Sequence, residues 1–402
     1  TPCRTASMAA YALEWLNLLL RWFHFVAGIS WIGTSLYFVW LDNHLTVPRD
    51  VADEQRGVSG ELWSVHGGGF YHNQKYLTGP AGEPLPGTLH WFKWEAYSTW
   101  LSGIGLLAVI YWAGASNYLI DRSVLDLTPA AAIAISAATV VVGWFVYDAL
   151  CRLLARWPLV LGVSVYAFLV LATWGLFHLF GARAAYVHAG AIIGTIMAAN
   201  VLFVIIPGQR KMVDAIRKGQ KPDPRPGQLG KIRSVHNTYF TLPVLFIMIS
   251  IHYPMTYDNA YGWLVLAGIS LSGVLVRYFF ILSHKDKIVP ALPIAAFALL
   301  AVIAFAIMPR GGAAKAVPYA QVRPIFAQRC AVCHSAHPTQ PGFSAAPAGV
   351  LLDTPQHIAS NAQRVYQQAV ATTAMPLGNV TGMTKTERDL VGGWIAGGAK
   401  IP

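Results

Sequence analysis

Two cysteines and a histidine near the C-terminus, Cys330, Cys333 and His334, form a C-x-x-C-H sequence. Two intervening residues allow one helical turn to present both thiols on one side, with the imidazole directly beyond them. This is the attachment motif of c-type haem, in which the thiols bond to the vinyl groups and the histidine binds the iron. A zinc site would need a second ligand pair, but the other cysteines, Cys3 and Cys151, are far away along the chain. The motif therefore predicts one covalent haem c and single-electron chemistry.

The haem iron also needs a sixth ligand, which in cytochromes c is usually a methionine thioether. Two methionines follow the motif, Met375 and Met383. Met375 is followed by Pro376, whose ring stiffens the backbone of such a loop. The sequence therefore favours Met375 as the ligand and assigns Met383 to core packing.

The composition predicts a membrane protein. Hydrophobic residues make up 55% of the 402 residues and charged residues only 12%, a balance that does not fit a soluble protein. The net charge of +11 does not indicate nucleic acid binding, because the basic residues cluster in loops between apolar runs. A helix needs about 20 mostly apolar residues to cross the bilayer core. Eight segments qualify as transmembrane helices: 12–41, 96–113, 131–151, 158–181, 185–207, 236–252, 261–283 and 289–308.

The loops between these segments predict an orientation. The loops 42–95, 152–157, 208–235 and 284–288 carry sixteen Lys and Arg residues, and the opposite set carries three. The richer set is expected in the cytoplasm. Eight crossings then put both termini in the periplasm, which is where bacteria attach haem c. We therefore expect a multi-pass protein of the bacterial inner membrane with a periplasmic haem domain.

The expected fold class is all-α, with a polytopic membrane domain over residues 1–308. A linker rich in Gly, Ala and Pro follows at 309–320, and a class I cytochrome c domain is expected over 321–402. Helices are predicted at Val322–Arg329 and Thr386–Ala399. Within the long cytoplasmic loop 42–95, the segment Glu61–Tyr76 predicts two short strands around a Gly-Gly-Gly turn.

Ionisable side chains inside a membrane are costly, so they are candidates for function. The first span contains Arg21 and His24, followed by small residues that would admit a flat cofactor. An imidazole is a common haem ligand and an arginine can pair with a propionate, so a second, non-covalent haem b is a hypothesis for this helix. The alternative is a histidine that bonds to another span. The sequence does not choose a second ligand among His178, His188 and His252.

A second polar cluster is expected near the cytoplasmic face. Its members are Asp42, His44, Lys93, Glu95, His236, Asn237, Arg277 and His284. A buried guanidinium such as that of Arg277 needs an acceptor, which would be either Glu95 or an anionic ligand.

The chain resembles a known family, the membrane-bound, cytochrome c-linked urate oxidases, or PuuD-type urate hydroxylases. The resemblance covers nearly the whole chain. It is carried by WFHFVAGISWIG at 22–33, VHGGGFY at 65–71, LHWFKWEAY at 89–97, VHNTYFTLPVLF at 235–246, CAVCH at 330–334 and TAMPLGNVTGM at 373–383. It implies oxidation of urate to 5-hydroxyisourate with water as oxygen donor and without hydrogen peroxide. Electrons would pass through the haem domain to a soluble cytochrome c or a terminal oxidase.

Urate is a planar anion, so its site needs a cation, amide or carbonyl partners and aromatic faces. The residues expected to supply these contacts are Arg277, Lys93, Asn237 and Gln74, and the candidate bases are Glu95, His66, His72 and His236. Three other functions remain open: a dehydrogenase for another small molecule or a quinol, a non-enzymatic electron conduit, and a transporter with a redox-sensing tail.

Overall fold

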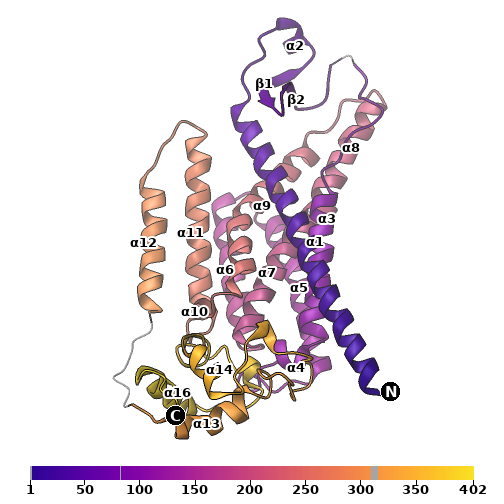
Figure 1. The fold of residues 1–402 in the computed structure, drawn as a ribbon. Coiled ribbons are helices and arrows are strands. Elements are labelled where there is room, and N and C mark those ends of the chain that lie inside the picture. The colour runs from indigo at the N-terminus through magenta and orange to yellow at the C-terminus, as the bar shows by residue number, and fades with distance from the viewer. Residues whose placement is uncertain (1, 82, 309–315) are drawn as a thin grey trace.

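The computed structural model describes residues 2–81, 83–308 and 316–402, and it is a bundle of long helices with a small domain at one end (Figure 1). Both ends of the chain lie at the end of the bundle that carries this small domain, the tail end. A β-hairpin lies at the opposite end, the hairpin end. The bundle helices are α1 (Pro2–His44), α3 (Trp94–Leu106), α5 (Pro129–Leu153), α6 (Pro158–Phe177), α7 (Ala182–Ala199), α8 (Ile206–Arg217), α9 (Arg225–Ser250), α11 (Gly262–Ser283) and α12 (Ala291–Ala306).

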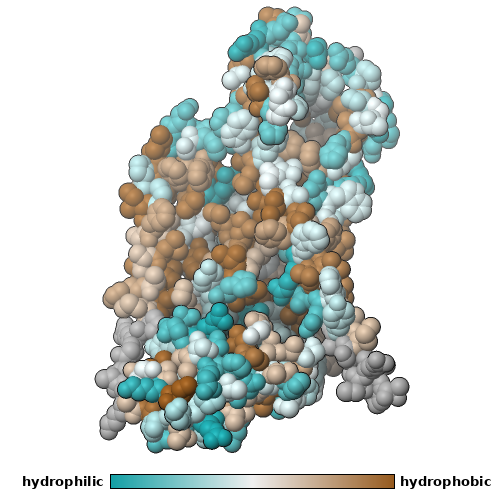
Figure 2. Space-filling model, in the orientation of Figure 1, coloured by the Kyte–Doolittle hydropathy of each residue, from teal (hydrophilic) through white to brown (hydrophobic). Residues whose placement is uncertain are grey.

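Five of these segments are long and apolar enough to cross a membrane: Tyr11–His44, Pro129–Leu153, Pro158–Phe177, Ala182–Arg217 and Gly262–Ser283. The other three predicted spans are also helical but do not meet the same criterion. Helix α3 is short and continues as a π-helix, η1 (Leu107–Trp112), α9 begins in a charged segment, and α12 has only 16 residues. Eight crossings therefore stay a prediction. On the face drawn in Figure 2, apolar side chains predominate over the middle of the bundle, and polar side chains are more frequent at the hairpin and at the small domain.

Helix α7 is the centre of the bundle and packs against α3, α5, α6, α9 and α11. Small residues allow this close packing. A Cβ atom on Gly143 of α5 would lie 2.7 Å from the Ile192 side chain, and one on Gly190 of α7 would lie 2.6 Å from Ile247. At its end α7 widens into a π-helix, η2 (Asn200–Ile205), before it continues as α8. Such π segments are rare and are often found at functional sites.

The hairpin consists of β1 (Val58–His66) and β2 (Gly69–Tyr76), which pair antiparallel, with the short helix α2 (Val51–Gln55) before them. Gly67 and Gly68 make the turn with φ angles of +59° and +81°, a region that favours glycine. The predicted pair of strands is confirmed, and this hairpin is the exception to an otherwise helical fold.

The tail domain covers the described residues 316–402. Its elements are α13 (Tyr319–Ile325), η3 (Phe326–Cys330), η4 (Pro347–Gly349), α14 (Pro355–Ser360), α15 (Ala362–Val365), η5 (Tyr366–Val370), η6 (Leu377–Asn379) and α16 (Lys385–Ala396). Its core packs Phe326 against Trp394. Helix α13 begins inside the predicted linker 309–320, of which residues 309–315 lie outside the described part. Helix α16 ends before Ala399 because Gly397 and Gly398 follow it, the latter at φ +92°.

Candidate functional site

The C-x-x-C-H motif has a geometry that suits a covalent haem. Cys330 ends η3, and the chain continues in a turn in which the N–H of His334 donates to the Cys330 carbonyl at 2.9 Å. The Nδ1 atom of His334 donates to the Val350 carbonyl at 3.0 Å, which leaves Nε2 with a free lone pair. Burial lowers the pKa of His334 and so favours the neutral imidazole that binds iron. Cys330, Cys333 and His334 are all half-buried. Two thiols and a neutral imidazole in this turn are a donor set that fits haem c.

The two methionines lie in different surroundings. Met383 is 4% exposed and belongs to the tail-domain core. Met375 is half-buried, and its backbone is held on both sides. Its N–H donates to the Gln368 carbonyl at 2.8 Å, and Nη1 of Arg388 donates to the Met375 carbonyl at 2.7 Å. These contacts fix the position of the segment 371–379, which we call the Met375 loop, and Met375 remains the predicted sixth ligand.

The Met375 loop is also the part of the tail domain that contacts the bundle. Both the N–H and the hydroxyl of Thr373 donate to the Asp258 carboxylate, the hydroxyl at 2.8 Å. Asp258 follows the short helix α10 (Pro254–Tyr257), which precedes α11. Gly378, at φ +55°, lies so close to the bundle that a Cβ atom there would be 2.8 Å from the Ile120 carbonyl oxygen. The loop that carries the predicted iron ligand is therefore packed directly on the bundle.

Further contacts surround this interface. Asn117 donates to the Pro341 carbonyl at 3.3 Å, and the Ser344 hydroxyl donates to Glu14 at 3.1 Å. A cavity of about 130 Å³ lies between the two parts, and Arg183 and Met375 are both among its lining residues. The tail domain is thus attached to the bundle at several points separated widely in the sequence.

A buried polar network lies in the bundle toward the hairpin end, where α5, η2 and α9 meet. We call it the Arg233 network; its members are Tyr147, Asp148, Asn200, Arg233, His236 and Asn237. Nη2 of Arg233 donates to Asp148 at 2.6 Å, and its Nη1 donates to Asn200 Oδ1 at 3.3 Å. The guanidinium also lies over the ring of Tyr147, 5.1 Å from its centroid. The charge of Arg233 is therefore compensated inside the protein.

The network continues from Asn200, which is completely buried. Nδ2 of Asn200 donates to the Tyr147 hydroxyl at 3.1 Å and to Asn237 Oδ1 at 2.9 Å. Nδ2 of Asn237 donates to the Met197 carbonyl at 3.0 Å. The Tyr147 hydroxyl lies 2.8 Å from Nδ1 of His236. Two predicted site residues, His236 and Asn237, are thus held by side chains of other helices.

Sequence reasoning missed Tyr147, Asp148, Asn200 and Arg233. One signal was present, since Asp148 is an ionisable residue inside the predicted span 131–151. Arg233 lies in the predicted loop 208–235, and nothing in the local sequence shows that Asn200 faces both α5 and α9.

The structure does not bring the members of the predicted cytoplasmic cluster together in one site. Nε of Arg277 donates to the Thr238 hydroxyl at 3.0 Å, whereas His236 faces Tyr147 on α5. Positions 236 and 238 are separated by about 200° around helix α9. Arg277 and the Arg233 network therefore lie on different sides of α9. The expected acceptor Glu95 forms no ion pair with Arg277 among the described residues, and its Oε2 atom is buried without a hydrogen-bond partner.

Two further members of the predicted cluster meet at the ends of α1 and α11. The rings of His44 and His284 have centroids 5.7 Å apart, and His44 also stacks on Trp40. Nζ of Lys93 lies 5.9 Å from the ring centroid of its neighbour Trp94.

Of the two candidate histidines of the hairpin, His72 is engaged within it and His66 is not. His72 bonds through Nε2 to the buried carboxylate of Glu61 at 2.7 Å and stacks on Trp63 at 4.3 Å. The Arg49 N–H donates to the other oxygen of Glu61 at 2.9 Å. This backbone bond and the His72 bond lower the pKa of Glu61. His66 is exposed beside the turn. These contacts give His72 a structural role.

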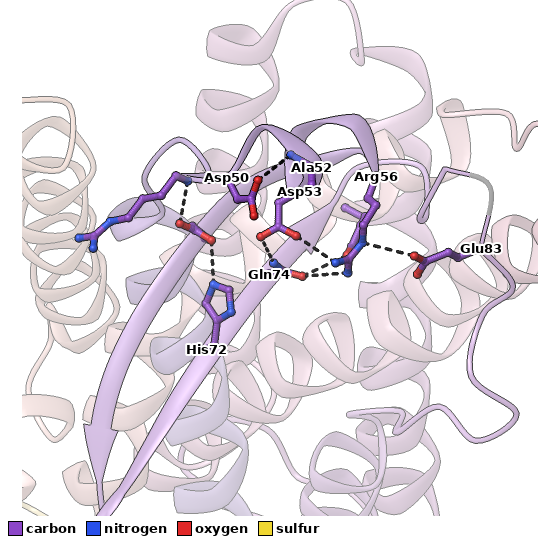
Figure 3. A network of polar contacts seen from close by, with 10 residues as sticks. Asp50, Ala52, Asp53, Arg56, His72, Gln74 and Glu83 are labelled. Atoms are coloured by element: carbon purple, nitrogen blue, oxygen red, sulfur yellow. Dashed lines mark hydrogen bonds and ion pairs between the residues drawn. The ribbon is translucent and has the colours of Figure 1, made fainter.

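A second set of hairpin contacts holds Gln74 and Asp42, and Figure 3 shows the contacts of Gln74. Gln74 donates to Asp53 at 2.8 Å, and Arg56 pairs with the same carboxylate at 3.0 Å. Lys75 pairs with Asp42 at 2.6 Å, which ties the hairpin to the end of α1. Gln74 and Asp42 therefore stabilise the hairpin rather than join the residues of α9 and α11.

The four histidines considered for haem b differ in availability. His188 is completely buried; its Nδ1 donates to the Ala184 carbonyl at 2.8 Å, and its Nε2 accepts from the Ser136 hydroxyl at 2.6 Å. Both ring nitrogens are therefore engaged, which does not fit an iron ligand. His178 and His252 are exposed at the tail end of the bundle.

Within the described residues, only one ring nitrogen of His24 has a hydrogen-bond partner. Its Nδ1 donates to the Thr99 carbonyl at 3.0 Å and lies 3.0 Å from the Ser102 hydroxyl, so that it joins α1 to α3. Arg21 donates to Asn17 at 2.7 Å on the exposed side of α1. His24 therefore has the contact expected of a histidine that bonds to another span, with Nε2 still available.

Comparison with known proteins identifies the bundle. A family profile described as "Urate oxidase N-terminal" matches residues 10–308. The chain belongs to this family. Among curated proteins and solved structures, none matches the chain.

The urate oxidase N-terminal family accounts for the bundle and the hairpin, because its match ends at Met308. Membership indicates an oxidoreductase related to urate oxidation, with apolar helices compatible with a membrane. The tail domain lies beyond the matched residues, and its interpretation rests on the C-x-x-C-H motif and its geometry.

Proposed function

We propose that this protein is a membrane-bound oxidoreductase that oxidises urate to 5-hydroxyisourate and transfers the electrons to a haem c in the tail domain. The urate monoanion reacts with one water molecule, and 5-hydroxyisourate, one proton and two electrons are formed. The haem accepts one electron at a time. A soluble cytochrome c or a terminal oxidase removes each electron before the next arrives. The enzyme would lie in a bacterial inner membrane, with both termini and the tail domain in the periplasm.

The observation that carries the proposal is the contact between the two parts of the chain. A bundle of the urate oxidase N-terminal family is joined to a domain with a haem c motif, and the Met375 loop packs on the bundle through Thr373 and Gly378. Haem c would be bonded to Cys330 and Cys333, with His334 and Met375 on the iron. When bound, it supplies a one-electron acceptor next to the bundle.

Arg277 is the cation that best suits the urate anion. None of the ion pairs among residues 2–81, 83–308 and 316–402 includes it, and its contact is the neutral hydroxyl of Thr238. The Arg233 charge, in contrast, is already neutralised by Asp148. Among the candidate bases, Glu95 has a buried carboxylate oxygen that finds no hydrogen-bond partner in the described part of the chain, and this oxygen would receive the proton that urate releases.

A haem b shared by His24 and His188 does not fit these contacts, because both nitrogens of His188 are bonded within the protein. The proposal therefore rests on haem c alone.

The test is anaerobic addition of urate to the purified, oxidised protein. With protein in excess, each urate should reduce two haems, measured at the c-type α band, and oxygen from labelled water should enter the product. Xanthine serves as the control substrate. Reduction by a quinol but not by urate would overturn the proposal in favour of a quinol dehydrogenase.

The variant Arg277→Leu separates binding from haem assembly. It should abolish reduction of haem c by urate, while dithionite still reduces a normally assembled haem. Thr238→Val is the matched control, because it removes the hydrogen bond but keeps the charge. Normal turnover by Arg277→Leu would contradict the assignment of Arg277.

A further inference from the structure

The cavity between the tail domain and the bundle, which we call the interface cavity, contains an arginine whose hydrogen bonds are incomplete. Arg183 lies in the first turn of α7 and lines this cavity. In the described part of the chain its Nε atom is buried without a hydrogen-bond partner, and none of the ion pairs there includes Arg183. A buried N–H group without an acceptor costs free energy. The interface cavity has room for such an acceptor.

A carboxylate lines the same cavity. Asp121 lies beside the start of α7, since a Cβ atom on Gly181 would be 3.4 Å from the Cβ of Asp121. Its Oδ1 accepts from the N–H of Ser123 at 2.9 Å and from the Ser123 hydroxyl at 2.6 Å, and its Oδ2 accepts no hydrogen bond from the residues that the structure describes. The second carboxylate of the lining, that of Asp258, already accepts from Thr373. The cavity therefore offers an acceptor oxygen as well as a donor nitrogen.

The rest of the lining suits a flat polar molecule. Two tyrosines, Tyr118 and Tyr257, and two amides, Asn117 and Gln368, are among the lining residues. Aromatic rings pack against flat molecules, and amides both donate and accept. The cavity volume of about 130 Å³ is far larger than the roughly 10–15 Å³ that one water molecule needs, so a small organic molecule can enter.

We propose that the interface cavity binds a planar cyclic ureide, a ring in which N–H groups alternate with C=O groups. Arg183 donates to a carbonyl oxygen or to a deprotonated ring nitrogen, and Asp121 accepts from a neighbouring N–H. A compact anion such as sulfate offers Asp121 no proton and is repelled by it. Urate belongs to the favoured class. Its choice as the ligand rests on the function proposed above, whereas the incomplete hydrogen bonds of Arg183 do not.

The interface cavity is separate from the position of Arg277. Arg277 lies 15 residues after Gly262, the first residue of α11, which is about 22 Å along the helix. Tyr257 and Asp258, which line the cavity, come just before Gly262. Met375, the predicted iron ligand, also lines the cavity. A urate molecule bound there is therefore next to the Met375 loop and far from Arg277.

Binding is measured by equilibrium dialysis of labelled urate against the full-length protein, whose haem is first reduced with dithionite so that no turnover occurs. The background is Arg277→Leu, because it removes the other proposed cation, and this variant should bind one urate per chain. Adding Arg183→Gln should weaken that binding by about 10–100-fold, because a hydrogen bond to a charged group is lost. Arg122→Gln is the matched control. Arg122 is the neighbour of Asp121 but its side chain is 85% exposed, so its loss should leave binding unchanged.

Hydrogen–deuterium exchange locates the bound urate. Urate should slow exchange in the Met375 loop and at the start of α7, and Arg183→Gln should remove this protection. Sulfate at the same concentration should give no protection. If Arg183→Gln does not assemble haem c, Ala182→Leu takes its place, because Ala182 also lines the cavity and a larger side chain there narrows it.

Two results would overturn the inference: no urate binding by Arg277→Leu, or protection of the Met375 loop that persists in Arg183→Gln. These results are distinct from a failure of the proposed function. If the wild type oxidises urate but urate does not protect the Met375 loop, the inference fails and the proposed function stands. If urate protects this loop but is not oxidised, the proposed function fails and the inference stands.

Discussion

The carboxylate of Asp148 binds two guanidinium groups at the same distance, but the two should differ greatly in what they contribute to stability. Arg152 Nε and Arg233 Nη2 each lie 2.6 Å from one of its oxygens. The Arg152 side chain is 76% exposed, and the Arg233 side chain is 8% exposed. Replacing each arginine by glutamine therefore compares one contact geometry in water and in the protein interior.

The expected magnitudes follow from this difference in exposure. An exposed ion pair four residues apart on a helix contributes about 0.3–0.5 kcal/mol. Breaking a buried pair costs about 3–5 kcal/mol, because the remaining charge loses its compensation. Arg152 stays near Asp148 when Arg233 is replaced, so the lower end of that range applies. We expect a loss of about 3 kcal/mol for Arg233→Gln and of less than about 1 kcal/mol for Arg152→Gln.

The assay is thermal unfolding of the purified protein in detergent, followed by helical circular dichroism. The decrease in Tm should be at least about threefold larger for Arg233→Gln than for Arg152→Gln. The haem c spectrum before heating is the control, because neither residue contacts the tail domain. The double variant Asp148→Asn, Arg233→Gln should lose less stability than the sum of the losses measured for Asp148→Asn alone and for Arg233→Gln alone. Equal decreases for the two arginine variants would show that burial of the Arg233 pair is not what stabilises the bundle.

Three further predictions concern the tail domain. Thr373→Val removes the hydroxyl donor to Asp258 and should increase hydrogen–deuterium exchange in the Met375 loop; unchanged exchange would argue against docking through this contact. Gly378→Ala should increase it further, because a Cβ atom would meet a bundle carbonyl at 2.8 Å and the φ angle is +55°. The Thr384 N–H and then Arg329 lower the pKa of Glu387. The ionised Glu387 carboxylate therefore stabilises the folded tail domain. This stabilisation is fully present above the ordinary pKa of 4.5 and is lost as the pH falls through the depressed pKa. Glu387→Gln should therefore flatten the acid dependence of tail-domain unfolding, followed by haem c absorption, and a steeper dependence would contradict the assignment.

The parts of the fold that depend on local sequence were predictable. Glycines at 67–69 between two alternating runs identified the hairpin, which the structure confirms. The apolar runs identified the helices, because all eight predicted spans lie on helices of the structure. Five of these helical segments also have the length and apolarity of a membrane span. The three others, in α3, α9 and α12, do not meet that criterion: α3 has 13 residues before a π-helix, α9 begins in a charged segment, and α12 has only 16 residues.

The predicted site was recovered only in part, for a physical reason that particular residues make clear. Lys93, Glu95, His236 and Arg277 were grouped because they occur at the same expected depth. Depth does not determine the direction in which a side chain points around its helix. Rotation about the α9 axis sends His236 toward α5 and Thr238, with Arg277, toward α11. His72 was expected to act on a substrate but is bonded to Glu61 in the hairpin.

The sequence by itself determined the haem c motif and the apolar segments, because both depend on spacing along a few consecutive turns of the chain. Only the tertiary structure decided which polar groups meet. Asp148 and Arg233 are 85 positions apart, and Asp258 and Thr373 are 115 apart. Contacts of this kind depend on the packing of whole helices, since each partner gains its hydrogen bond only after α5, α7 and α9, or the bundle and the tail domain, have come together.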